Sequence, residues 1–474
     1  NSNVHSAGSI VGVSNVLTVR PFGIAVTGIM AGATANPGGS APTDPIFTVA
    51  GGGFEATVAA VLWDAADDGD NDGVLDSGTY ANNAVAPSYA WDTTLQVSSA
   101  AASYTPDPGV PGVLNNGSIL LAEFGGGVFN VVDLQYTEVG SFTLLSSALD
   151  FLGEPSADIV GDDIVIGRFI PASFDVTHPG AANGLLGEGC VAFTYIGQDF
   201  TYATAPIFTV TAKNLLGDTT AQYRDTFAKL GGGSVSADVG QDTTTLGSDS
   251  NPLLVSYTAA PMTFVVNNDG SVDYTFGPDT FRYGPDAPVT FSKFANSEVD
   301  QFTGDIQPEI SAVTDGEATT VYPAGSILID PDGNTNRFGR LRMDNIFGSE
   351  LNPLLMPVFV EYLDMGFWQK SLGDSCTTIV DADLTYSATP AGLSTPTVVS
   401  SPAAAGDIDL SFSAPGAGNE GYVDASVDLA SAAHLWLRYD WDADGVFDND
   451  PGARASFGIF EGNPVQIYIQ QIYE

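Results

Sequence analysis

Apolar and polar residues alternate along much of the chain, which is the pattern of β-strands with one buried face. Apolar side chains stand at every second position in 208–212, 435–439 and 465–469. The 54 glycines and 28 prolines interrupt such runs at short intervals, as in sandwiches of many short strands. One short helix is predicted at 221–230 from the spacing of its apolar residues. The pattern predicts an all-β protein of tandem antiparallel β-sandwich (Ig-like) domains with long loops.

A short internal repeat suggests that the sandwiches are related modules. The pentapeptide Pro45–Val49 recurs as Pro206–Val210, an offset of 161 residues (206 − 45). A chance recurrence in a strand-rich chain is the alternative. We expect a first sandwich at 1–165, a second Ig-like sandwich at 166–258 and a C-terminal β domain at 259–474.

The charge balance narrows the choice of partners and environment. The chain has 13 basic and 57 acidic residues, a net charge of −44, which disfavours nucleic acids and anionic membranes. Hydrophobic residues make up 44%, which is enough to build cores. No apolar run has the length of a membrane span. The chain begins at Asn1 without a visible leader, so we expect a processed chain in a saline, calcium-containing exterior.

Two Asp-rich loops carry the most specific motif of the chain. Both fit D-x-D-x-D-G-x-x-D, the first nine positions of an EF-hand-type calcium loop. In such loops the acidic side chains at positions 1, 3, 5 and 9 and the carbonyl at position 7 face one cation. The predicted Ca²⁺ ligands are Asp68, Asp70, Asp72, Val74 and Asp76 in one loop, and Asp440, Asp442, Asp444, Val446 and Asp448 in the other.

The alternative is a pair of solvated acidic turns, which a chain this acidic would contain by chance. Position 12, normally a bidentate carboxylate, is Thr79 in one loop and Pro451 in the other. A further ligand would then have to come from Asp64, Asp67 or Asp450. Trimmed loops of this kind are typical of extracellular modules, where affinities of about 10⁻⁴–10⁻³ M suffice. The weaker acidic turn at 267–273 is predicted to be an ordinary hairpin turn.

Cys190 and Cys376 are the only cysteines. They fit either two buried thiols or one disulfide, and the expected exterior location favours the disulfide. Neither has a neighbouring histidine or a Cys-x-x-Cys partner, so catalysis or zinc binding is not expected.

No enzyme signature stands above background. The three histidines, at positions 5, 178 and 434, show no metal spacing, and there is no nucleophile elbow, P-loop or dinucleotide motif. We expect no catalytic residue and no organic cofactor. Trp63 and Trp436 are expected to pack in the core rather than stack on sugars. Arg337 and Arg340 are expected to anchor inter-domain ion pairs.

Several segments taken in order resemble a known family across almost the whole chain. These segments are 19–23, 167–171, 190–198, 211–219, 337–342, 374–377, 455–460 and 468–473. They are similar to MshQ-like proteins of bacterial mannose-sensitive haemagglutinin (MSHA) type IV pilus systems, in their C-terminal region of unknown function. The sequence departs from that pattern in two ways: it does not show the lectin-like sandwich that family members often carry before this region, and it ends in Ile469–Tyr473, where we would expect an Arg-Glu pair.

The resemblance implies a cell-surface or pilus-associated protein and supplies no catalytic residues. The leading hypothesis is a non-enzymatic, calcium-stabilised adhesin or tip component, with pilus or surface proteins and a host or surface glycan as partners. The second is a subunit of a self-assembling extracellular filament joined by strand addition, with 11–26 and 464–473 as candidate donor strands. The third is a secreted carbohydrate-active enzyme, recognisable by an open groove with two facing carboxylates.

Overall fold

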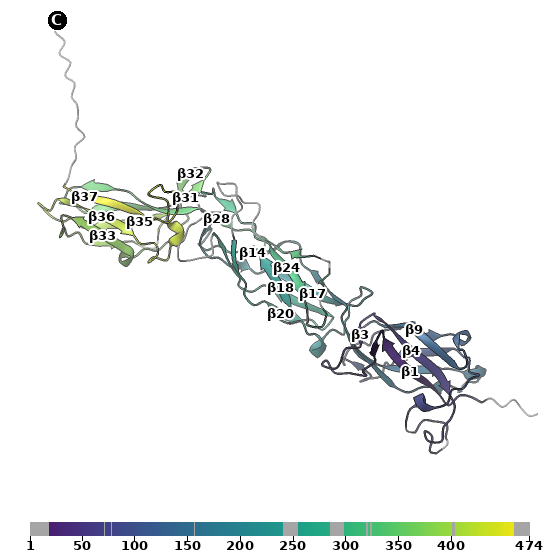
Figure 1. Ribbon diagram of the computed structural model, residues 1–474. Helices are drawn as coiled ribbons and strands as arrows, with labels where there is room; N and C mark the ends of the chain where they lie inside the picture. Colours follow the sequence, from purple (N-terminus) through teal and green to yellow (C-terminus); the bar gives the residue numbers. More distant parts are fainter. Residues whose placement is uncertain are drawn as a thin grey trace, which may run out of the picture.

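Three β-sandwiches lie end to end in an elongated row (Figure 1). The computed structural model describes residues 19–458 except 71, 77, 156, 240–254, 285–297, 319–320, 323–324 and 401–402. We call 20–170 the first sandwich, 171–336 the middle sandwich and 337–458 the third sandwich. The prediction of an all-β protein of tandem sandwiches is confirmed. No helix within the described residues is long and apolar enough to cross a membrane.

The first sandwich packs a five-stranded sheet against a seven-stranded sheet. Its core alternates along strands β4 and β10, as the period-two pattern requires, and includes Phe54, Val58 and Phe142. The first sheet holds β1 (Gly23–Ala31), β2 (Thr34–Ala35), β4 (Gly53–Val61), β7 (Leu114–Asn115) and β9 (Val128–Tyr136). The second holds β3 (Thr48–Val49), β5 (Thr93–Val97), β6 (Tyr104–Thr105), β8 (Ser118–Ile119), β10 (Gly140–Ala148), β11 (Ile159–Val160) and β12 (Ile164–Ile170). Three 3₁₀ turns are η1 (Tyr80–Asn82), η2 (Leu121–Glu123) and η3 (Phe151–Gly153).

The middle sandwich is built from five smaller sheets. The largest holds β13 (Ser173–Thr177), β17 (Ile207–Lys213), β20 (Thr263–Val266), β21 (Ser271–Thr275) and β25 (Val321–Tyr322). A second sheet holds β14 (Ala181–Leu186), β16 (Tyr202–Thr204) and β27 (Asp330–Asp332), and a third holds β15 (Thr194–Tyr195), β23 (Phe302–Thr303) and β28 (Thr335–Arg337). A fourth holds β18 (Val235–Val239), β24 (Pro308–Val313) and β26 (Ile327–Leu328), and the last pairs β19 (Val255–Thr258) with β22 (Thr280–Tyr283). One 3₁₀ turn is η4 (Asp225–Phe227).

The third sandwich has an Ig-like arrangement in which an early strand, β30, pairs in parallel with the last described strand, β37. One sheet holds β29 (Gly339–Met343), β31 (Leu354–Asp364), β32 (Phe367–Lys370), β34 (Thr397–Val399) and β35 (Asp407–Phe412). The other holds β30 (Ile346–Gly348), β33 (Leu384–Thr389), β36 (Gly421–Val427) and β37 (Gly452–Phe457). Two 3₁₀ turns are η5 (Asp381–Asp383) and η6 (Leu435–Leu437).

The sheets place the domain boundaries elsewhere than the sequence suggested. β17 pairs with β21, and β18 pairs with β24, so the boundary expected between 258 and 259 cuts through the middle sandwich. β12 pairs with β10, so the first sandwich continues past 165 to Ile170. Turn-rich segments inside the middle sandwich mislead composition-based boundaries, because long loops and linkers share the same residues.

Two predictions of local secondary structure are wrong, and a third falls on residues that the structure does not describe. The helix expected at 221–230 is only the 3₁₀ turn η4, and the strand expected at 435–439 contains the 3₁₀ turn η6. In both places large apolar side chains, such as Tyr223, Phe227 and Leu437, are buried in the cores of the sandwiches, and tertiary packing overrides the local pattern. The strand expected at 465–469 lies outside the described residues.

Candidate metal centres and inter-domain joints

The first Asp loop brings three carboxylates together after strand β4. Ligand oxygens of Asp68, Asp70 and Asp76 all lie within 4.8 Å of one another. Asp68 is buried, and its two oxygens accept hydrogen bonds from the Asp72 and Gly73 amides at 3.1 and 2.9 Å. Such close like charges repel one another, and a divalent cation would offset that repulsion. Oxygen-only donors suit a hard cation such as Ca²⁺.

The second Asp loop repeats this backbone arrangement. Oxygens of Asp440, Asp442 and Asp444 lie within 4.8 Å of one another. The amides of Asp444 and Gly445 donate to Asp440 at 3.0 Å each, as the equivalent amides do in the first loop. Val446 then donates to Asp444 at 2.8 Å, matching the 2.8 Å bond from Val74 to Asp72. Two loops 372 positions apart (440 − 68) therefore adopt one local fold.

The converging sets differ in part from the predicted ligands. Asp72 is absent from the first set and Asp448 from the second, although each remains in its loop. Whether the Val74 and Val446 carbonyls ligate a cation stays a prediction. Asp450 lies outside the converging set, and both its oxygens accept hydrogen bonds from Arg438, at 2.8 and 3.2 Å. Asp64 and Asp67 also lie outside the converging set.

One apolar side chain ties each loop to a hydrophobic cluster. At position 8, Leu75 packs against the cluster of Phe22, Ala25, Val61 and Tyr80. The equivalent Phe447 is buried, with its ring centroid 5.2 Å from that of Phe338. The sequence reasoning missed this role, although an apolar residue stands at position 8 of both loops. The cluster around Phe447 contains residues of the middle and third sandwiches, including Leu186, Phe281 and Leu363.

Aromatic residues near the loops are more exposed than expected. Trp63 is 49% exposed and donates from Nε1 to Asp68 at 2.8 Å, so its prediction as a core residue is wrong. Trp436 packs partly buried against the third core, as predicted. Trp441, inside the second loop, is 39% exposed and lies by Arg340.

Arg340 and Arg337 hold the loop and the sheets together, though not through the expected inter-domain ion pairs. Arg340 stacks on Trp368 at 3.7 Å and pairs with Glu361 at 2.7 Å, both within the third sandwich. Arg337 lies between Phe193 of the middle sandwich and Tyr362 of the third, 4.1 and 4.0 Å from the ring centroids.

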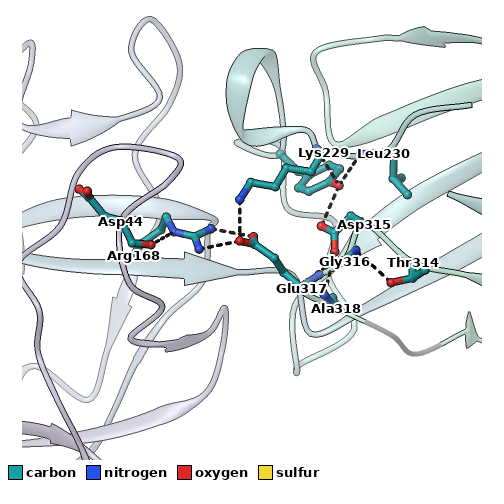
Figure 2. A network of polar contacts seen from close by, with 10 residues as sticks. Asp44, Arg168, Lys229, Leu230, Thr314, Asp315, Gly316, Glu317 and Ala318 are labelled. Atoms are coloured by element: carbon teal, nitrogen blue, oxygen red, sulfur yellow. Dashed lines mark hydrogen bonds and ion pairs between the residues drawn. The ribbon is translucent and has the colours of Figure 1, made fainter. Parts of the chain in front are cut away.

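Arg168 anchors the first joint, between the first and middle sandwiches (Figure 2). Its guanidinium donates to both oxygens of Glu317 at 2.8 Å each, and its Nε donates to the Asp44 carbonyl at 2.8 Å. Lys229 adds a second cation at 2.6 Å from Glu317. Burial raises the pKa of Glu317, but the hydrogen bonds and charges of Arg168 and Lys229 outweigh it and hold the pKa below its usual value.

A second set of contacts at the first joint uses backbone groups. Glu138 accepts from the Ala221 and Gln222 amides at 3.1 and 2.9 Å. Burial raises the pKa of Glu138, and these backbone bonds oppose the shift in part. Asn214 donates to the Thr137 carbonyl at 3.1 Å. Directional bonds on both sides of the joint therefore fix the relative orientation of the two sandwiches.

A disulfide closes the second joint, between the middle and third sandwiches. Cys190 of the middle sandwich is bonded to Cys376 of the third, with Cα atoms 5.7 Å apart. The predicted pairing is confirmed. Cys190, Phe193 and Tyr195 are members of the third sandwich's own core cluster. The middle sandwich therefore inserts side chains into the third.

Buried polar contacts surround the disulfide. The Tyr195 hydroxyl oxygen lies 2.8 Å from both the Ser371 hydroxyl and the Asp374 carboxylate, and its single proton is donated to the carboxylate. Asp374 is fully buried and also accepts from the amides of Cys376 and Thr377, at 3.0 and 2.9 Å. Buried polar groups with satisfied partners favour a single arrangement of packed elements. The second joint is therefore fixed by a covalent bond, apolar packing and hydrogen bonds together.

The described histidines have structural surroundings. His178 accepts from the Gly180 amide at 3.1 Å, and His434 Nε2 lies 2.9 Å from both the amide nitrogen and the carbonyl oxygen of Thr378. Burial lowers the pKa of His434. His5 lies outside the described residues.

Profiles of a single family match nearly the whole chain. They describe the second, third and fourth domains of DUF6701 and cover residues 20–131, 138–334 and 337–472. The chain belongs to the DUF6701 family. The boundary between the third and fourth DUF6701 domains coincides with the end of the middle sandwich at strand β28. No curated protein matches the chain.

Solved structures offer only distant likenesses. An I-band fragment of titin is 8% identical, with a TM-score of 0.23, covering 86% of this chain and 93% of the fragment. Domains 1–6 of the surface layer protein SbsC are 10% identical, with a TM-score of 0.17, covering 95% of this chain and 56% of that one. At such TM-scores neither likeness bears on the function of this chain.

Proposed function

We propose that the chain is a rigid, elongated spacer within an extracellular protein of a bacterial surface appendage, and that it is not an enzyme. The observation that carries this proposal is the construction of the two joints. Arg168 and Glu317 fix the first, and Cys190 and Cys376 fix the second. Flexible multidomain chains usually meet through small polar contacts and reorient freely. Here three sandwiches keep one extended arrangement, which suits a part that holds something away from a surface.

Charge and chemistry support the extracellular location. Disulfides persist in oxidising compartments and are rare in the cytosol. A net charge of −44 is best tolerated where divalent cations and salt screen it. The resemblance to MshQ-like proteins refines the proposal to a pilus-associated adhesin or tip component.

Calcium in the two Asp loops would stiffen this spacer. The second loop matters most, because Phe447 connects it to the cluster that the middle and third sandwiches share. A cation held by Asp440, Asp442 and Asp444 would order the loop that positions Phe447. The first loop would act in the same way on the cluster at Leu75.

Small-angle X-ray scattering in calcium and in chelator tests the spacer. A single maximum dimension in calcium, matching the extended row, supports it, and a broad distribution of shorter distances would refute it. Attachment is tested with beads coated with the chain, on host and environmental surfaces, with calcium and with chelator. Calcium-dependent binding supports an adhesin, whereas equal binding in both conditions counts against calcium-dependent adhesion.

The filament hypothesis remains a second candidate. Of its candidate donor strands, the residues at 23–26 already pair with β4 inside their own sheet. Residues 464–473 lie outside the described part. Growth into fibres without surface binding would favour this hypothesis over the adhesin.

The carbohydrate-active enzyme has less support. A hollow of about 690 Å³ over β33, β36 and β37 is lined by Asp424, which is ion-paired with Arg454 at 2.7 Å. A second, of about 720 Å³, lies over β5 and the turn at 112–118. Neither lining brings two carboxylates face to face. Release of reducing sugar from a panel of polysaccharides would overturn the non-enzymatic proposal.

A further inference from the structure

We propose that the protein carries tension along its length, and that the Cys190–Cys376 disulfide routes this tension around most of the middle sandwich. The inference builds on the spacer role. It concerns the path of force through the covalent chain, which the shape of the molecule does not determine.

The covalent path through the middle sandwich is short. It runs from Pro171 to Cys190, which is 20 residues, and then crosses the disulfide to Cys376 of the third sandwich. Strand β13 contributes five of these residues and β14 contributes six. The other residues of the middle sandwich, 191–336, lie inside the loop that the disulfide closes.

This path crosses the middle sandwich from one joint to the other. At its start, Ala172 bonds to Lys213 at 2.8 Å, and the next residue, Asn214, bonds to Thr137 of the first sandwich. At its end, the Glu188 carboxylate accepts from the Thr335 amide at 3.1 Å, beside the second joint. β13 and β14 therefore act as one strap that spans the unit and changes sheets at 178–180.

The strap is short compared with the segment that it bypasses. A chain reaches at most about 3.3–3.6 Å per residue, so these 20 residues span no more than about 66–72 Å. β13 pairs regularly and is already close to full length, whereas β14 pairs irregularly with β27 and has positive φ at Ala182 and Gly184. Pulling on the ends of the protein can therefore lengthen this route only by the slack of β14 and the turns beside it, while residues 191–336 stay inside the closed loop.

The same bond protects the second joint. Force enters the third sandwich directly at Cys376, so the contacts of Tyr195, Arg337 and Phe447 are not loaded in series. Strands β29 to β32 also lie within the closed loop and are bypassed. Cys190 is 5% exposed and packed within the third core.

Single-molecule pulling of the full chain, with peptide handles at both ends, tests the route. The two cysteines are 186 positions apart, so the oxidised chain should extend to roughly 600–700 Å less than the reduced one. The comparison uses wild type with and without dithiothreitol, and a Cys190→Ser/Cys376→Ser variant. Dithiothreitol should leave the variant unchanged.

The pattern of unfolding steps decides the proposal. In oxidised wild type we expect steps from the first sandwich and from residues after Cys376, and new steps from the loop only after reduction. Equal extension in both redox states, or release of loop residues from the oxidised chain, would overturn the proposal. If the double variant fails to fold, the comparison of oxidised with reduced wild type still tests the proposal. If pulling contradicts the proposed force path while small-angle scattering still shows one extended shape, only the force path is refuted and the spacer role is not.

Discussion

Arg168 and Glu317 meet across the first joint through two N–H···O hydrogen bonds of 2.8 Å each. The Arg168 side chain is 4% exposed and that of Glu317 is 19% exposed. A planar guanidinium matches a carboxylate in this two-bond geometry, which fixes an angle as well as a distance. This pair therefore helps to set the orientation of two sandwiches, together with Val139 of the first sandwich, which is buried in the core of the middle one.

We expect Arg168→Ala to loosen the first joint and to lower stability by about 2–4 kcal/mol. Breaking a fully buried ion pair costs about 3–5 kcal/mol, and we expect a somewhat smaller loss here because Lys229 still neutralises Glu317. Urea unfolding measures the loss, and small-angle scattering should show a wider spread of dimensions. The matched control is Arg454→Ala, which breaks the exposed pair with Asp424. The control should leave both measurements nearly unchanged, and equal effects of the two variants would contradict the assignment.

The pH dependence of the first joint follows from Glu317. Its folded pKa lies below the usual value of 4.5, so the folded chain binds fewer protons than the unfolded chain. The stabilisation is therefore complete above the unfolded pKa and is lost as pH falls through the folded one. We expect the difference in melting temperature between wild type and Glu317→Gln to be largest above about pH 5 and to shrink as the pH falls below the usual value of 4.5 and through the lowered pKa of Glu317.

Glu138 provides a control of opposite sign at the same joint. Burial raises its folded pKa above the usual 4.5, so its contribution grows as pH falls through that raised value. The pH profile of Glu138→Gln relative to wild type should slope the other way. Profiles of the same slope for both variants would show that the joint is not the origin of the effect.

The sequence predicts the fold class and the local Asp loops better than it predicts how the three sandwiches are joined. Period-two alternation depends on neighbours in the chain, and the nine-residue Asp motif folds through its own backbone amides, as at Asp440 and Gly445. The disulfide could also be predicted without knowledge of the fold, because the chain has only two cysteines.

The joints could not be predicted, because their partners are far apart in sequence. Arg168 and Glu317 are 149 positions apart, and no local pattern distinguishes Glu317 from other acidic residues. The domain boundary predicted between 258 and 259 is wrong because β17 and β21, which lie on either side of it in the sequence, pair in one sheet. The sequence predicts Trp63 as a core residue at the end of a strand, whereas its indole donates to the buried Asp68.

Calcium uptake by the two Asp loops is a separate prediction. Asp70→Ala and Asp442→Ala should each remove one calorimetric site and reduce the rise in melting temperature with calcium, because a ligand that binds only the folded state stabilises it. Asp269→Ala is the control, since Asp269 accepts from Ser271 in an ordinary turn between β20 and β21. No uptake by wild type at millimolar calcium would rule out both sites.

Phe447 offers the sharpest test of the link between the second loop and the second joint. Its side chain is buried in the cluster shared by the middle and third sandwiches, so Phe447→Ala removes contacts from both. Truncation of a buried phenylalanine costs about 3–5 kcal/mol, and urea unfolding should show a loss of that size. The neighbouring Val446 is 37% exposed, and Val446→Ala should cost less than about 1 kcal/mol. If the loop and the joint are coupled, Phe447→Ala will also weaken calcium binding at Asp440–Asp448, while Val446→Ala will not. Unchanged calcium affinity in a destabilised Phe447→Ala protein would mean that the loop folds independently of the joint.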